Sequence, residues 1–217
     1  MRGTRTRIGG VAVAVVAIAA GGIGAGGTAV AAKKKGKKNP DRARFFQNAQ
    51  QLLIPDDPAG ASFPGQLDAT IRVGKAMKGK AVADADISVR ITHPDTADLD
   101  IFLIAPNGAT VALANDNGGP GQPLNTSYGS GPADCTGTPT TFNDETFNFL
   151  SNEALINEPG EILAPWAASV EPQGFPAPLN IVDGGRARGT WTLRILDDSN
   201  GDVGTLNCWK VRIKPEV

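Results

Sequence analysis

The feature that most constrains the fold is a strict alternation of apolar and polar residues in short stretches. Residues 86–92 read DISVRIT, in which isoleucine or valine occupies every second position. Residues 189–196 read GTWTLRIL and repeat the pattern with tryptophan, leucine and isoleucine. Successive side chains of a β-strand point to opposite faces, so these stretches predict strands with one buried face.

The rest of the chain extends this pattern and offers no competing helical one. Short runs with the same character occur at 68–73, 98–106 and 110–114, and no window long enough for a helix has convincing 3.6-residue spacing. Asn107-Gly108 between two of these runs is typical of a β-hairpin turn. Short strands punctuated by glycine and proline predict an all-β sandwich. Residues 115–188 are mostly loop, and loops this long are usually functional or pinned by a disulfide or an ion.

Alternation slips once in the final run, where the large apolar residues are Leu206 and then Trp209. One extra residue near Asn207-Cys208 would restore the pattern, so we expect a β-bulge there. The bulge would aim Cys208 sideways. Cys135 and Cys208 are the only cysteines, and in an exported chain such a pair most often forms a disulfide.

The first residues have the layout of a secretory signal peptide. Arginines are followed by an apolar run over residues 8–20, and Ala29-Val30-Ala31 offers a small-residue cleavage site. We therefore expect residues 1–31 to be a signal peptide, the mature protein to be secreted, and no stable membrane insertion after cleavage. An uncleaved membrane anchor is the alternative, because weakly apolar residues continue through Ala32.

Charge divides the remainder into a basic leader and an acidic body. Five lysines lie within Lys33–Lys38, whereas the chain beyond them has 13 basic and 22 acidic residues. We assign residues 32–51 to a basic, polar linker, whose lysines could contact an anionic cell-wall polymer or lipid, or form a solvated tether. No basic patch with interleaved aromatic residues occurs in the body, so we expect no nucleic-acid binding.

An ordered set of short motifs resembles the P domain, also called the P/Homo B domain, of kexin- and furin-like subtilisin proteases. The resemblance covers about residues 52–213, so we assign residues 52–217 to this domain, and it implies a jelly-roll β-sandwich of the galactose-binding-domain-like class. In that family the module follows the catalytic domain; here it would stand alone. The residues that carry the resemblance are Asp98, Leu99, Pro106, Gly108, Phe142, Asp144, Gly189, Trp191, Asp197, Gly204, Leu206 and Trp209.

Two acidic regions are candidates for calcium. An EF-hand loop beginning at Asp197 would need a glutamate at position 208, which is a cysteine, so we interpret residues 197–204 as the hairpin between the last two strands. Bacterial members of the resembled family commonly hold calcium against loop acids. Asp144 and Glu145, with Asp116 from another loop, could supply oxygen ligands if the loops converge; the alternative is ordinary solvated acids.

The residues indicate a domain that is not catalytic by itself. The chain has one histidine, His93, and lacks the sequence patterns of a Ser-His-Asp triad and of the HExxH zinc motif. We interpret His93 as a structural residue hydrogen-bonded to a neighbouring loop.

Two functions remain open. One is a monomeric interaction or stabilising module that docks to a subtilisin-like protease in trans. The other is a jelly-roll module that binds cell-wall polymer or carbohydrate, for which Trp166 in its loop could be a binding platform or, alternatively, a core anchor.

Overall fold

The computed structural model describes residues 42–58, 63–117, 127–150, 161–162, 166, 168–173 and 179–217. The chain divides into two compact units, Met1–Lys38 and Asn39–Val217, and the described residues all belong to the second. The expected signal peptide and the Lys33–Lys38 block lie outside the described residues. Among those that are described, no helix is long and apolar enough to cross a membrane.

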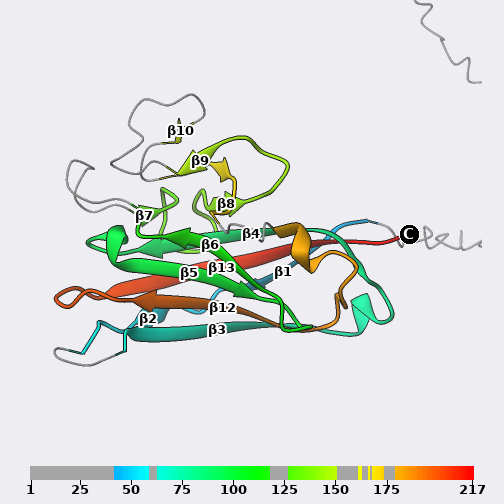
Figure 1. Cartoon of the computed structure of the whole chain (residues 1–217), viewed down its shortest axis with the longest axis horizontal. Helices are drawn as coiled ribbons and strands as arrows, with labels where there is room; N and C mark the ends of the chain where they lie inside the picture. Colours follow the sequence, from blue (N-terminus) through cyan, green and yellow to red (C-terminus); the bar gives the residue numbers. More distant parts are fainter. Residues whose placement is uncertain are drawn as a thin grey trace, which may run out of the picture. The chain divides into compact units, whose positions relative to one another are not determined.

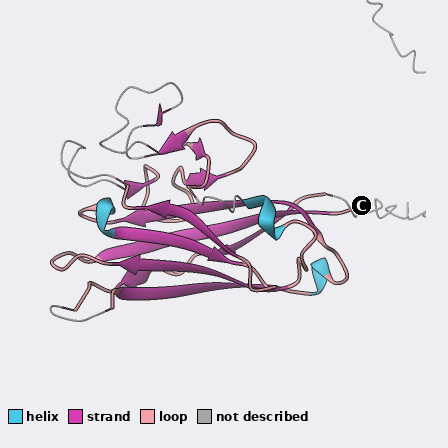
Figure 2. Cartoon of the chain, in the orientation of Figure 1, coloured by secondary structure: helices cyan, strands magenta, loops and turns pink. Residues whose placement is uncertain are grey.

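Two antiparallel sheets form the body of the domain (Figures 1 and 2). One has the order β1-β13-β4-β8-β11, with β2 paired to β13 and β7 to β4; the other has the order β3-β12-β5-β6. Only β11 pairs in parallel within the larger sheet. The strands of these sheets are β1 (Arg44–Asn48), β2 (Leu52–Ile54), β3 (Gly65–Val73), β4 (Val82–Thr92), β5 (Leu99–Ile104), β6 (Thr110–Asn115), β7 (Ser127–Tyr128), β8 (Thr140–Phe142), β11 (Ser169–Val170), β12 (Gly189–Asp197) and β13 (Gly204–Pro215).

The alternation of the sequence produces the sandwich. Along β12 the tryptophan, leucine and isoleucine of the predicted strand are completely buried, while the residues between them are partly exposed. Ile87, Val89 and Ile91 of β4 are likewise fully buried. Because each sheet directs one apolar face toward the other, a single core fills the space between them. The expected all-β sandwich is confirmed; its jelly-roll connectivity stays a prediction.

Short elements complete the described part. β9 (Phe149–Leu150) and β10 (Glu161–Ile162) pair in parallel and form a separate two-stranded sheet. Three 3-10 turns are described, η1 (Lys75–Met77), η2 (Thr96–Asp98) and η4 (Leu179–Val182). The segment expected to be mostly loop therefore contains several two- and three-residue strands, which are too short to produce a recognisable alternation.

The segment interpreted as a hairpin between the last two strands connects the two sheets instead. β12 pairs with β3 on one side and β5 on the other, so neither edge is free for β13. β13 pairs with β1, β2 and β4 in the opposite sheet. The hairpin interpretation of residues 197–204 is wrong, because strand pairing depends on distant segments that the local turn residues do not reveal.

The predicted bulge in the final strand is confirmed. Along the pairing of β13 with β4, Leu206 faces Ile91 and Cys208 faces Arg90, so one extra residue is inserted between them. That residue is Asn207, whose side-chain amide donates a hydrogen bond to the Thr92 hydroxyl at 2.9 Å. The insertion returns the apolar side chains of β13 to the core face.

The sheet begins earlier than the sequence suggested. β1 lies inside the segment 32–51 that we assigned to a linker, and it pairs with β13 over five residues, from Arg44 opposite Ile213 to Asn48 opposite Trp209. The expected domain start at residue 52 is therefore too late. This strand was missed because only Phe46, packed against the core, marks its inward face.

Candidate functional site

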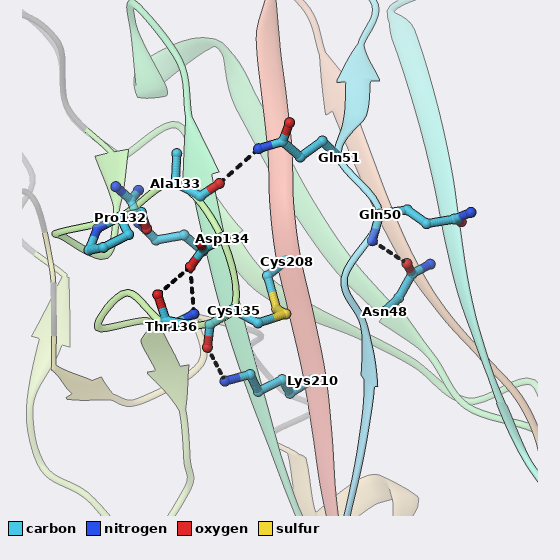
Figure 3. The surroundings of a disulfide bond; sticks show 11 residues. Asn48, Gln50, Gln51, Pro132, Ala133, Asp134, Cys135, Thr136, Cys208 and Lys210 are labelled. Atoms are coloured by element: carbon cyan, nitrogen blue, oxygen red, sulfur yellow. Dashed lines mark hydrogen bonds between the residues drawn. A yellow bond between two sulfur atoms is a disulfide. The ribbon is translucent and has the colours of Figure 1, made fainter.

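The two cysteines form a disulfide that fastens a long loop to the larger sheet (Figure 3). Cys135 lies in the loop between β7 and β8, and Cys208 lies at the bulge of β13, with 5.2 Å between their Cα atoms. The carbonyl of Cys135 accepts a hydrogen bond from Lys210 Nζ at 2.9 Å, and Gln51 Nε2 donates to the carbonyl of Ala133 at 2.9 Å. The expected disulfide is confirmed, and it pins the loop as predicted.

A buried arginine supports the same loop from the adjacent strand. The guanidinium of Arg90 donates to the carbonyl oxygens of Gly131 at 2.9 Å and Pro132 at 3.3 Å. Two glycines make room for it, because a Cβ at Gly129 or Gly137 would press against the Arg90 side chain. Burial lowers the pKa of Arg90. No sequence pattern indicated this role, since Arg90 occupies a polar position of an alternating strand.

The single histidine is buried and held in place. His93 Nε2 lies 3.1 Å from Asp197 Oδ2, with both side chains inaccessible to solvent, and His93 Nδ1 is hydrogen-bonded to the backbone of Asp95. A side chain at Gly204 would collide with the imidazole. The interpretation of His93 as a structural residue hydrogen-bonded to a neighbouring loop agrees with this geometry.

Asp98, which is partly buried, completes an acidic group around this histidine. His93, Asp98 and Asp197 each offer a ligand atom within 4.8 Å of the others. Burial, with Asp95 and Asp197 nearby, raises the pKa of Asp98 to about 6 against the opposing effect of His93. Burial also raises the pKa of Asp197. The backbone carbonyl of Asp98 accepts from the amide of Asp198 at 3.0 Å, which ties the inter-sheet crossing to the start of β5.

The remaining motif residues shape the opposite end of the sandwich. Gly108 has φ +88° in the turn between β5 and β6, and its amide donates to the carbonyl of Ala105. Gly189, with φ +151°, lies against Pro106 so closely that an added Cβ would be 2.5 Å from the proline ring. Trp191 Nε1 donates to the carbonyl of Ala187 at 3.0 Å. Fully buried core positions account for the others, which are Leu99, Phe142, Leu206 and Trp209.

The three residues proposed for calcium do not meet. Asp116 lies beside β5, where its amide donates to the carbonyl of Leu99, and its electrostatic neighbours are Asp100 and Asp198. Glu145 lies beside Asp84 and Asp86, near the start of β4. Leu99 pairs with Asp197, and Asp197 contacts His93. His93 directly follows the last residue of β4, so this contact lies at the opposite end of β4 from Glu145. β4 has 11 residues, and strands rise about 3.3 Å per residue, so the two groups are roughly 30 Å apart.

The group around Glu145 has the chemistry of a cation site. Burial raises the pKa of Asp86 and of Glu145, which a bound cation would oppose. Arg212 Nη1 donates to Asp84 Oδ2 at 2.8 Å and to Asp86 Oδ2 at 2.6 Å. The second oxygens, Asp84 Oδ1 and Asp86 Oδ1, are buried and have no hydrogen-bond partner. Sequence reasoning missed these two aspartates because it looked for calcium ligands in loops, whereas Asp84 and Asp86 occupy alternate positions within β4.

Asp144 and Asp183 extend this acidic group electrostatically. Burial and the charge of Asp144 raise the pKa of Asp183 to about 6. Asp144 also raises the pKa of Asp86 and Glu145. Of the three sequence-proposed residues, Asp144 and Glu145 therefore belong together and Asp116 does not. Asp116 adopts φ +49°, and burial together with Asp198 raises its pKa.

Trp166 is a core residue. It is fully buried, its ring centroid lies 4.7 Å from that of Tyr128, and its carbonyl accepts from the Thr140 hydroxyl at 2.6 Å. The other two tryptophans, Trp191 and Trp209, and the only tyrosine are also fully buried. None of these four rings can serve as an exposed stacking platform.

Comparison with known proteins gives one family and several longer relatives. The family of the proprotein convertase P-domain matches residues 82–213. The chain is 25% identical to the leupeptin-inactivating enzyme 1 of Streptomyces exfoliatus and 26% identical to the transglutaminase-activating metalloprotease of Streptomyces mobaraensis, each over 166 residues and 76% of the chain. These matches span only 25% and 14% of those two proteins.

Solved structures with similarity include the serine protease of Aeromonas sobria and its complex with a chaperone. Each is 15% identical, and the TM-scores are 0.37 and 0.38. The similarity covers 78% and 80% of this chain but only 27% and 28% of those chains. The chain thus spans about a quarter or less of the length of these relatives.

Proposed function

The chain belongs to the proprotein convertase P-domain family, and on that premise we propose that it is an exported, non-catalytic accessory module that binds and stabilises a secreted protease in trans. The observation that carries the proposal is the family match over residues 82–213, which includes most of the sandwich. Modules of this family accompany protease domains. The two curated relatives are themselves named as an inactivating enzyme and a metalloprotease, and both are several times longer than the matched segment.

The state of the single histidine supports a non-catalytic role. A serine protease needs an imidazole that receives the proton of the nucleophile and then passes it to the leaving group. His93 is the only histidine in the chain, and its two ring nitrogens face Asp197 and the backbone of Asp95 inside the core. A substrate cannot reach this ring without opening the junction between β4 and the inter-sheet crossing.

Exposed apolar side chains at the edge formed by β1 and β2 are the contact we expect for the partner. Phe45 of β1 is 71% exposed and Leu53 of β2 is 63% exposed. Their cross-strand neighbours on β13 are Arg212 and Thr205, so both side chains lie on the outer face of the larger sheet. Apolar side chains at an exposed sheet edge gain free energy when a partner covers them.

A glycan-binding role receives less support. Tryptophan and tyrosine combine a stacking face with a polar group, and all three tryptophans and the tyrosine are buried, so the exposed aromatic rings are phenylalanines such as Phe45 and Phe147. We therefore prefer the protease module to the aromatic-platform jelly roll.

Calcium, expected from the sequence, is kept as part of the proposal with a changed ligand set. We place it at Asp84, Asp86 and Glu145, with Asp144 nearby, instead of at Asp116. The two partnerless oxygens of Asp84 and Asp86 would satisfy their hydrogen-bonding deficit by coordinating a hard cation. Its role would be to hold the β8–β9 loop against β4.

The test measures binding and stabilisation with the full chain. The purified chain is immobilised and exposed to the culture supernatant of its source organism, and captured proteases are identified and purified. Each captured protease is then heated with and without the chain, and its residual peptidase activity is measured. We expect an increased half-life in the presence of the chain, and no hydrolysis of the peptide by the chain alone.

Matched variants make the result specific. Phe45→Ser with Leu53→Ser should weaken capture and remove the stabilisation, whereas Phe147→Ser, which alters a side chain that is 91% exposed in another loop, should leave both unchanged. Peptide hydrolysis by the pure chain, or equal stabilisation by all variants and by an unrelated β-sandwich, would refute the proposal.

A further inference from the structure

A basic cavity of about 790 Å³ opens at the end of the sandwich where β3 ends and β12 begins. The courses of these two strands can be followed in Figure 1. Its walls come from two connections, one running from β3 through η1 to β4 and the other leading from η4 into β12. The volume is in the range of sites for small-molecule ligands or for several units of a polymer. The lining residues are Arg72, Val73, Gly74, Lys75, Lys78, Gly79, Lys80, Ala81, Gly184, Arg186, Arg188, Gly189 and Thr190.

The charge of this cavity contrasts with that of the rest of the body. Six of the 13 basic residues beyond the Lys33–Lys38 block line it, three arginines and three lysines, and no acidic residue is among the lining residues. The nearest acid in sequence, Asp183, belongs electrostatically to the group of Asp84 and Asp144. A chain whose body is acidic overall therefore concentrates its positive charge in one concave site.

The cations of the cavity are available to a ligand, unlike Arg90, Arg194 and Arg212 in the sheets. Arg194 pairs with Asp68 at 2.8 Å, Arg212 pairs with two aspartates, and Arg90 donates to loop carbonyls. Apart from Lys80, the cations that line the cavity are Arg72, Lys75, Lys78, Arg186 and Arg188. Within the described residues, no ion pair or side-chain hydrogen bond engages these five. All five are exposed to solvent.

Backbone hydrogen bonds hold the two walls in place without a ligand. Val82 and Gly185 are joined by an amide-to-carbonyl bond of 2.8 Å, and the amide of Gly184 donates to the carbonyl of Val82 at 2.8 Å. The amide of Ala187 donates to the carbonyl of Lys80 at 3.1 Å. Met77 and Ala187, both fully buried, anchor the two walls to the core. Because the cavity is built into the fold, a ligand would not have to bear the entropic cost of forming it.

Glycines keep the interior of the cavity open. Gly74, Gly79 and Gly184 line it, and an added Cβ at any of the three would meet nothing within 4 Å. The cations therefore surround space that a ligand can enter. Gly74 has φ −93°, outside the left-handed region that favours glycine.

We propose that this cavity binds a linear polyol-phosphate polymer of the cell-wall type, with the backbone phosphates held by Arg72, Arg186 and Arg188 and the lysines adding positive charge around them. Guanidinium groups bind phosphate oxygens in a bidentate manner, and lysine ammonium groups bind them as point charges. An acidic protein segment fits less well, because lysine is depleted in protein interfaces and no aromatic or large apolar residue except Val73 lines the site. A neutral sugar would leave the unpaired cations without partners.

Binding at this cavity is independent of protease binding. The folded domain, instead of the Lys33–Lys38 block, would then make the expected contact with an anionic cell-wall polymer. The full chain is titrated with fluorescently labelled poly(glycerol phosphate), and binding is followed by fluorescence anisotropy at several salt concentrations. Poly-glutamate and phosphatidylglycerol vesicles serve as competing sources of negative charge. We expect saturable binding of the phosphodiester that weakens as salt increases.

Variants with matched charge locate the site. Arg186→Glu with Arg188→Glu should reduce affinity at least about tenfold, since two charge-assisted contacts are lost. Arg42→Glu with Lys214→Glu changes the net charge equally at exposed positions outside the cavity and should leave affinity within about twofold. Replacing the five lysines of Lys33–Lys38 by glutamine should leave the saturable component in place.

A second variant tests the cavity without altering charge. Gly74→Trp should fill part of the open space and weaken binding, while Gly74→Ala should not, and the melting temperature of each variant confirms that it is folded. The proposal is overturned if the control pair weakens binding as much as the cavity pair, or if only the lysine-block variant loses it. It is equally overturned if poly-glutamate binds as tightly as the phosphodiester, if only vesicles bind, or if nothing binds.

Discussion

Removing the disulfide should cost the domain about 4.4 kcal/mol of stability. Cys135 and Cys208 are separated by 73 residues in sequence, and closing a loop of that length removes about 15 cal/mol/K of chain entropy from the unfolded state. The perturbation is reduction of the wild-type chain, compared with a Cys135→Ala, Cys208→Ala variant. At about 2 to 4 °C per kcal/mol, the melting temperature should fall by roughly 9 to 18 °C.

The assay is urea unfolding followed by tryptophan fluorescence. All three tryptophans are buried in the core, so their emission reports global unfolding. The tryptophan bands of the near-UV circular dichroism spectrum should agree between the reduced and oxidised proteins in the absence of denaturant, because Arg90 and Lys210 still bind the loop that carries Cys135. The loss of stability would then arise in the unfolded chain.

Two results would refute this reasoning. A stability loss below about 1.5 kcal/mol would show that the unfolded chain already keeps the two segments close. Changed tryptophan bands in the near-UV spectrum on reduction would show that the disulfide builds the native loop, which the hydrogen bonds of Arg90 argue against.

Three further predictions concern other parts of the domain. Gly204→Ala should destabilise by about 1 to 3 kcal/mol through overpacking, whereas Gly74→Ala should be close to neutral; chemical denaturation checks both, and equal effects would contradict the packing argument. Burial and the nearby Asp116 raise the pKa of Asp100 to about 6 from 3.8, so its contribution to stability is fully present below about pH 4 and is lost as pH rises through 6. In EDTA, Asp100→Asn should therefore melt higher than wild type at pH 7 and flatten the pH dependence; a lower melting temperature at pH 7 would contradict the sign. Calcium should raise the melting temperature of EDTA-treated protein, and Glu145→Gln should reduce that rise; identical melting with and without EDTA would exclude the site.

Local patterns predicted the elements that depend on local chemistry. The strands β4 and β12 follow from alternation, and the bulge at Asn207 follows from a slip in alternation within one strand. The disulfide followed from the even number of cysteines and the expectation of export, without any knowledge of the fold. Each of these inferences needs only residues that are close in sequence, or a count.

The features that escaped prediction depend on pairing between distant segments. The crossing from β12 to β13 looked like a hairpin, since glycine and asparagine give the same local signal in either case. Asp84 and Asp86 join Glu145 only because β8 pairs with β4. The cations of the basic cavity come from residues 72 to 188 and carry no motif, so that only the two walls, once folded, reveal them.

The placement of β13 has a consequence for how the protein is made. This strand lies between β4 on one side and β1 and β2 on the other, and it also carries Cys208. Until the ribosome has released it, the earlier partners have no common neighbour to align against and Cys135 has no thiol to meet. The larger sheet therefore closes late, only after the segment that carries β13 has been synthesised, and until then β1, β2 and β4 remain without the strand that joins them.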